Sequence, residues 1–84
     1  SSYELADIIS ISGKAESTGE NQVEISIENA DNKVIWKEEV NIKSNGEFTT
    51  LAIAGGPGWE ESGEYSLKVK QGSLFKEISF NFKA

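Results

Sequence analysis

Apolar and polar residues alternate with a period of two along almost the whole chain, and this pattern constrains the fold more than any other feature. In the clearest case, from Val23 to Glu28, every second residue is a β-branched aliphatic and the residues between are polar. No window of about 11 residues has the spacing of an amphipathic helix. Strict alternation is typical of antiparallel strands with one face on a core. The sequence therefore predicts an all-β fold.

Turn-forming residues divide this pattern into about seven short strands. Residues 16–21 form a polar loop, Asn45-Gly46 is typical of a hairpin turn, and residues 55–58 are too rich in glycine to lie inside a ladder. Glu38 falls on an otherwise apolar face, which predicts a bulge or a break there. The expected strands run from Tyr3 to Ile11, Val23 to Ile27, Val34 to Trp36, Val40 to Ile42, Phe48 to Ile53, Tyr65 to Val69 and Leu74 to Phe82. In the first, Leu5, Ile9 and Ile11 share one face, and residues 12–15 continue it after a kink or a switch between sheets. In the last, Ile78, Phe80 and Phe82 point inward. This spacing favours a β-sandwich of one domain, residues 1–84.

The segment from Glu61 to Val69 resembles the tyrosine corner of immunoglobulin-like sandwiches, with Tyr65 two residues before Leu67. In those domains two cysteines and a tryptophan surround the centre of the core. The resemblance implies that Ile25, Trp36 and Leu67 take these places here, without a disulfide. It also implies that Trp36 and Phe80 belong to the core.

A finer resemblance is to immunoglobulin-like repeats of prokaryotic cell-surface proteins, above all archaeal S-layer polypeptides. Its motifs cover about Ser12 to Phe82; the chain is also similar to macroglobulin-type sandwich domains. The resemblance implies a structural or adhesive block of an exported protein, although the chain has no Asn-x-Ser/Thr sequon for a glycan. The motifs are Val-x-Ile-x-Ile at Val23, the Asx turn before Lys-Val-Ile-Trp at Asp31 to Trp36, Asn-Gly-x-Phe at Asn45, the glycine-rich loop with Trp59, Ser-Gly-x-Tyr-x-Leu-x-Val at Ser62, and Phe-x-Phe at Phe80.

Composition excludes several classes of function. The chain has no Cys, His or Arg, which removes thiolate chemistry, the commonest general base and bidentate phosphate recognition. A formal net charge of −6 and a pI near 4.5 disfavour nucleic acid and anionic membranes as partners. No apolar run reaches the roughly 20 residues of a membrane span. The absence of Met suggests a domain excised from a longer polypeptide.

Two aromatic residues are candidates for carbohydrate binding. Trp59 lies in the loop from Gly55 to Gly63, and Phe75 approaches it if the last hairpin folds back. An exposed tryptophan can stack on a sugar ring. The alternative, which we favour, is that Trp59 closes one end of the sandwich and fixes the glycine-rich loop.

Three carboxylates, Glu60, Glu61 and Glu64, are weak candidates for a Ca²⁺ site with Asp31 or Asp7. Calcium requires six to eight oxygen ligands from a shaped loop, and no Asp-x-Asp spacing occurs here. Ordinary solvated charges are the favoured interpretation. For nucleophilic catalysis the composition allows only a Ser-Lys pair, Ser66 and Lys68, which alternation places on a solvated face.

Together these features predict a non-catalytic module of an exported cell-surface protein, a spacer or assembly domain without a cofactor. Its expected partners are neighbouring domains of the same or a similar surface protein, associated end to end or through an edge strand. Nucleic acid and direct membrane insertion are not expected. The alternatives are a carbohydrate-binding module, a Ca²⁺-bridged assembly domain and a domain that packs beside the catalytic part of an enzyme.

Overall fold

A computed structural model describes residues 2–15 and 21–84, which form seven β-strands and, within these ranges, no helix. No helix in the described part of the chain is long and apolar enough to cross a membrane. The predicted polar loop at residues 16–21 lies almost wholly outside the described residues. The strands are β1 (Ser2–Glu4), β2 (Ile8–Lys14), β3 (Gln22–Glu28), β4 (Val34–Asn41), β5 (Glu47–Ile53), β6 (Gly63–Gln71) and β7 (Leu74–Lys83).

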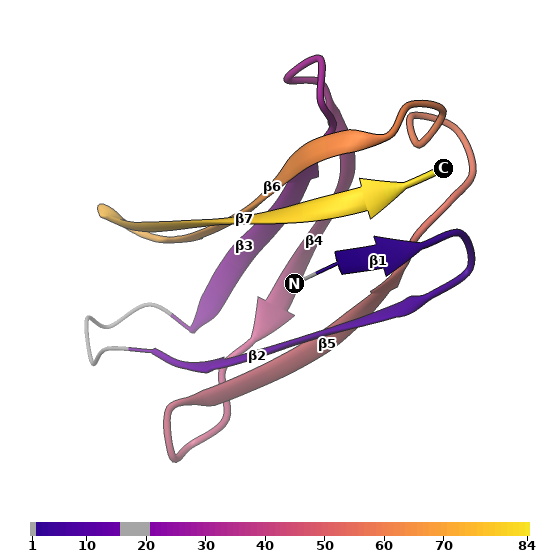
Figure 1. Cartoon of the computed structure of the whole chain (residues 1–84). Coiled ribbons are helices and arrows are strands. Elements are labelled where there is room, and N and C mark those ends of the chain that lie inside the picture. Colours follow the sequence, from indigo (N-terminus) through magenta and orange to yellow (C-terminus); the bar gives the residue numbers. More distant parts are fainter. Residues whose placement is uncertain (1, 16–20) are drawn as a thin grey trace.

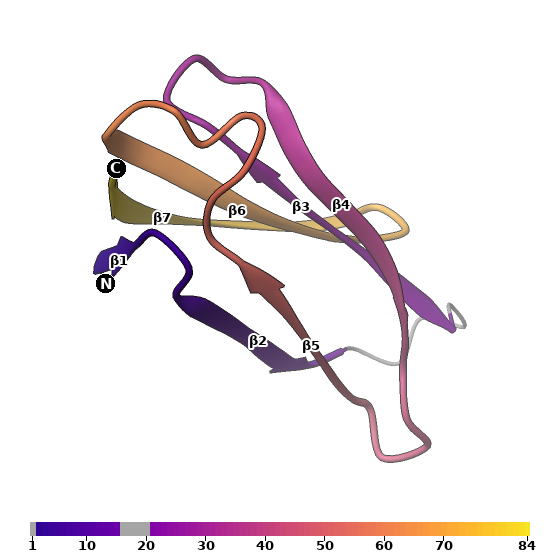
Figure 2. The same ribbon diagram turned by 90° about the vertical axis from the view of Figure 1, so that its right-hand side faces the viewer.

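The strands form two sheets that face each other, so the predicted all-β sandwich is confirmed (Figures 1 and 2). The larger sheet has the order β1-β7-β6-β3-β4, and the smaller sheet contains only β2 and β5. All pairs are antiparallel except β1 with β7, which are parallel. Short β1 covers only the end of β7, because Ser2, Tyr3 and Glu4 pair with Asn81–Lys83.

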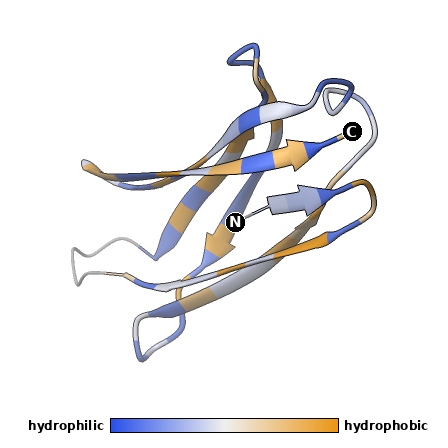
Figure 3. Ribbon diagram, viewed as in Figure 1, coloured by the Kyte–Doolittle hydropathy of each residue, from blue (hydrophilic) through white to orange (hydrophobic). Residues whose placement is uncertain are grey.

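The core lies between the sheets and follows the alternation of the sequence (Figure 3). Val23, Ile25 and Ile27 of β3 are almost completely buried, and the residues between them face outward. On β2 and β5 the inward side chains are Ile9, Ile11, Phe48 and Ala52. Aliphatic burial of this kind supplies about 25 cal/mol per Å² of apolar surface, so it stabilises the sandwich without a disulfide.

The predicted first strand is in fact two strands that belong to different sheets. Ala6 takes a left-handed conformation (φ 72°), and Asp7 closes the turn by accepting a hydrogen bond from the Glu4 N–H at 2.8 Å. The chain therefore changes sheets at Ala6, before the position expected at residues 12–15. The prediction that Leu5 points inward with Ile9 and Ile11 is wrong, because Leu5 lies in this turn and is exposed.

This extra strand corrects the predicted centre of the core. The prediction placed Trp36 on the third strand of the chain. In the structure the third strand is β3, and Trp36 lies on the fourth, β4, at the edge of the larger sheet. Ile25 is fully buried as predicted, but Trp36 and Leu67 are only half-buried against the core. Phe80 is buried, whereas Ile78, predicted to be buried with it, is exposed.

Strand β4 is continuous, so neither the bulge nor the break predicted at Glu38 occurs. Glu38 pairs with Ile25 in a regular ladder, stays exposed and accepts a hydrogen bond from the Thr50 hydroxyl at 3.1 Å. The irregularity lies farther along, between Ile27 and Glu28. The prediction failed because the two sheets differ in width. A carboxylate on the edge strand of the larger sheet can face inward and still be in contact with water, so no bulge is needed.

The Asn45-Gly46 turn forms as predicted, but the strands on either side do not pair. Gly46 has a φ of 87°, and its N–H donates to the carbonyl oxygen of Lys43 at 2.8 Å. Strand β4, before the turn, belongs to the larger sheet, and β5, after the turn, belongs to the smaller one. A turn of hairpin type thus connects the two layers of the sandwich.

Candidate functional site

Tyr65 forms the corner that the sequence predicts. Its side chain is fully buried, and its hydroxyl donates a 2.6 Å hydrogen bond to the carbonyl oxygen of Glu61. Burial raises the pKa of Tyr65 above its ordinary value of 10.0, and the nearby carboxylates of Glu60, Glu61 and Asp31 raise it further. The hydroxyl therefore stays protonated at neutral pH and serves as a fixed donor.

Replacing Tyr65 with phenylalanine is expected to lower the free energy of unfolding by about 1–2 kcal/mol, because the partner carbonyl loses its donor while the ring still fills the core. Urea denaturation of the two proteins measures this difference. A loss below about 0.5 kcal/mol would show that the corner hydrogen bond contributes little.

The same hydroxyl predicts a loss of stability at alkaline pH. Since the folded pKa lies above the unfolded one, the contribution of Tyr65 is complete below about pH 10 and is lost as the pH rises through the raised folded pKa. Melting temperatures between about pH 9 and pH 12 should therefore fall more steeply in the parent protein than in Tyr65→Phe. Parallel curves for the two proteins would contradict this assignment.

Trp59 is a core residue and offers no face to a sugar. It is 5% exposed, and its indole stacks on Tyr65 with ring centroids 5.0 Å apart. A second ring, that of Phe82, forms a T-shaped pair with the indole, with ring centroids 4.9 Å apart. This arrangement agrees with the favoured prediction that Trp59 closes one end of the sandwich, because both neighbouring rings belong to the buried core.

Phe75 does not approach Trp59. It is exposed and pairs with Lys70 near the turn between β6 and β7, whereas Trp59 contacts Phe80 and Phe82 toward the far end of β7. Five residues of extended strand between Phe75 and Phe80 span roughly 16 Å. The structure thus does not bring the two candidate carbohydrate residues together.

The candidate Ca²⁺ ligands do not converge either. Glu60 and Glu61 line a small cavity of about 140 Å³ with Asp31, but Glu64 lies outside it on β6. Glu60 uses one carboxylate oxygen to accept a 2.8 Å hydrogen bond from the Gly58 N–H. Among the described residues, no group of three or more Asp, Glu, His or Cys side chains is arranged to hold a metal ion.

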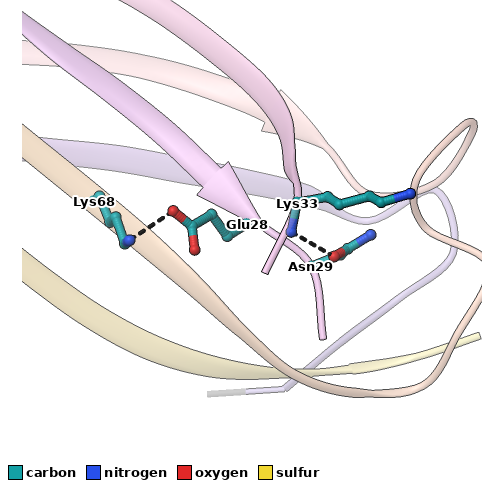
Figure 4. A network of polar contacts seen from close by, with 4 residues as sticks. All are labelled: Glu28, Asn29, Lys33 and Lys68. Atoms are coloured by element: carbon teal, nitrogen blue, oxygen red, sulfur yellow. Dashed lines mark hydrogen bonds and ion pairs between the residues drawn. The ribbon is translucent and has the colours of Figure 1, made fainter. Parts of the chain in front are cut away.

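Asn29 organises the loops around this corner. Its Oδ1 accepts hydrogen bonds from the N–H groups of Asp31 and Lys33, each at 3.0 Å, and the second of these is drawn in Figure 4. Its Nδ2 donates to the carbonyl oxygen of Gly58 at 3.1 Å. One amide thus closes the turn between β3 and β4 and ties it to the glycine-rich loop. The predicted Asx chemistry at this turn is confirmed.

Lys68 is held by Glu28 and is unsuited to act as a general base. Its Nζ lies 2.6 Å from a carboxylate oxygen of Glu28, across β3 and β6 (Figure 4). This hydrogen bond raises the pKa of Lys68, so the amine stays charged at neutral pH. Ser66, its candidate partner in nucleophilic catalysis, therefore has no neutral amine beside it to accept a proton.

A groove of about 320 Å³ was not foreseen from the sequence. It lies between β2 and the hairpin of β6 and β7, and its lining is mostly apolar. Lys14 and Lys76 are the charged residues that line it, and no described carboxylate does so. The sequence signal for it was the presence of Leu74, Phe75 and Ile78 on both faces of one strand, which simple alternation does not explain.

No protein-family model, curated protein or solved structure matches this chain.

Proposed function

We infer that this domain is a non-catalytic structural and association module of an exported cell-surface protein. The observation that supports this proposal is that several strands within residues 2–15 and 21–84 have one side without a paired strand. Strands β2 and β5 pair only with each other, and β4 ends the larger sheet. Open edges present backbone N–H and C=O groups to which another strand can pair. A small sandwich of this kind is suited to joining neighbouring domains.

The side-chain chemistry supports a role without catalysis. The larger cavity contains lysines but no described carboxylate, so it lacks an acid–base pair. Tyr65 and Lys68, the groups with raised pKa values among the described residues, both remain protonated at neutral pH and are engaged in structural contacts. Neither is poised to exchange a proton near neutrality.

Three features support an exported location and a partner of the same kind. The net charge of −6 favours solubility and repels anionic polymers. The chain folds without cysteine, as the surface repeats that it resembles do. The buried Tyr65 corner and the strand motifs of that resemblance occur in the order expected. Neighbouring domains of the same or a similar surface protein are therefore the proposed partners.

Labelling of intact cells that produce the protein tests this proposal. A membrane-impermeant amine reagent should modify its exposed lysines without permeabilisation, while a cytosolic marker protein in the same cells stays unmodified. Labelling that appears only after lysis would contradict an exported location. The experiment does not depend on which surface of the domain binds a partner.

A further inference from the structure

Most of strand β7 is unpaired on one side. Its residues pair with β6 along the whole strand, but on the other side β1 covers only Asn81–Lys83. No described residue pairs with that other side of Leu74–Phe80, which we call the open edge. In Figure 2 the hairpin of β6 and β7 extends well beyond β1. The open edge is on the same side of β7 as β1.

Apolar side chains are left exposed along this open edge. Leu74, Phe75 and Ile78 are 42%, 57% and 58% exposed, whereas Phe80 on the same strand is buried. Ile78 pairs with Leu67 and has the inward parity of Phe80, so it faces the space between the sheets. It stays exposed because the opposite sheet, which contains only β2 and β5, is too narrow to cover it.

The open edge forms one wall of the 320 Å³ groove, and β2 forms the other. Strand β2 pairs only with β5, so its side toward the groove also lacks a partner among the described strands. An apolar groove between two unpaired strands fits an extended peptide better than a compact ligand, because a peptide satisfies the backbone groups as well as the side chains.

The charges of the groove favour a particular partner. Lys14 and Lys76 line it without a described carboxylate, in a domain whose net charge is −6. A second copy paired antiparallel about Lys76 or Glu77 would place like charges opposite each other, and one paired about Ile78 would place Lys76 opposite Phe80, without a carboxylate. Like charges in directly opposed positions destabilise a ladder. A different segment that carries a carboxylate avoids this repulsion.

We propose that the open edge and the groove bind an extended segment of another polypeptide, with apolar side chains at alternate positions and a carboxylate near Lys76. The segment adds a strand to the larger sheet beside Leu74–Phe80 and covers Ile78. This inference rests on the proposed association function and specifies the surface that performs it.

The test uses a synthetic peptide, acetyl-Thr-Ile-Thr-Ile-Thr-Glu-Thr-amide, titrated into the ¹⁵N-labelled protein. We expect saturable amide shifts concentrated in residues 74–80 and slower hydrogen exchange in the same segment. A peptide with proline in place of its two inner threonines, the third and fifth residues, should not bind, because proline removes backbone donors and breaks the ladder. A peptide with Lys in place of Glu should bind at least about tenfold more weakly.

Two matched variants locate the surface. Ile78→Asp should weaken peptide binding by about tenfold or more, whereas Ile53→Asp should leave it unchanged. Both isoleucines lie in strands and are similarly exposed, at 58% and 60%, but Ile53 does not line the groove. Since both side chains are exposed, both variants should remain folded, which a thermal melt verifies.

Three results would overturn the proposal: no saturable shift up to about 1 mM peptide, equal weakening by the two variants, or self-association of the free protein through residues 74–80. The last would identify a second copy as the occupant. Failure here with positive labelling of intact cells would remove the docking surface and leave the exported location standing. Peptide binding combined with labelling only after lysis would support the docking surface and contradict the exported location.

Discussion

Replacing Trp59 with alanine is expected to lower the free energy of unfolding by about 3–5 kcal/mol. The indole is 5% exposed and packs on Tyr65 and Phe82, so alanine leaves a cavity at the end of the core. Contacts between aromatic rings add about 0.5–1.5 kcal/mol for each pair beyond the burial of their surface. Urea denaturation followed by circular dichroism measures the loss.

Trp36→Ala is the matched control for this prediction. Trp36 lies on the edge strand β4 and is only half-buried, so its replacement should cost clearly less than that of Trp59. The order of the two losses distinguishes this structure from a sandwich centred on Trp36. An equal or larger loss for Trp36→Ala would contradict the position of Trp59 in the core.

Replacing Gly58 with alanine is expected to cost about 2–4 kcal/mol, from two effects that act together. Gly58 has a φ of 93°, a conformation that strains any residue with a Cβ atom. An added Cβ would also collide with Cγ2 of Ile35 and lie 2.7 Å from its Cβ. Ile35 packs against the core, so it cannot move aside without cost.

Gly56→Ala separates the two effects. Gly56 has nearly the same φ, 91°, but an added Cβ there meets no atom within 4 Å. Its replacement should cost only the conformational strain of about 1–2 kcal/mol. The difference between the two variants in urea denaturation therefore measures the contact with Ile35. Equal losses would show that the glycine-rich loop does not pack on β4.

Features that depend on neighbouring residues were predictable from the sequence. Alternation correctly placed Val23, Ile25 and Ile27 in the core, and Asn45-Gly46 formed a turn, although this turn connects the two sheets and does not close a hairpin. The Tyr65 corner was also confirmed, because its hydroxyl bonds to a carbonyl only four residues away. Each of these features is decided within a short stretch of chain.

The errors arose where the relation between the sheets decides the outcome. The alternation of the first segment gave no sign that the chain changes sheets at Ala6, so the strands at residues 22–28 and 34–41 were counted one place too early. Trp36 was consequently placed at the centre of a core that it only borders. Ile78 has an inward position, but the width of the opposite sheet, which no local pattern encodes, leaves it exposed.

The same limit applies to the candidate sites. The sequence analysis singled out Trp59 by its place in the glycine-rich loop, but a loop tryptophan binds a ligand or closes a core according to the rings around it. Glu60, Glu61 and Glu64 are close in sequence, yet the start of β6 separates Glu64 from the cavity that the other two line. The groove beside β7 is formed by strands far apart in sequence, so the apolar residues of β7 could indicate an unusual strand but not the opposite wall of the groove.

Nuclear Overhauser contacts in the labelled protein test the arrangement of the sheets most directly. We predict backbone contacts between Tyr3 and Phe82 in parallel register and between Ile11 and Thr50 in antiparallel register. In the free protein, the open edge at residues 74–80 should show cross-strand contacts to β6 alone. Antiparallel contacts between β1 and β2 would contradict the structure. Contacts from Ile78 to a second strand besides β6 would contradict the docking surface as well.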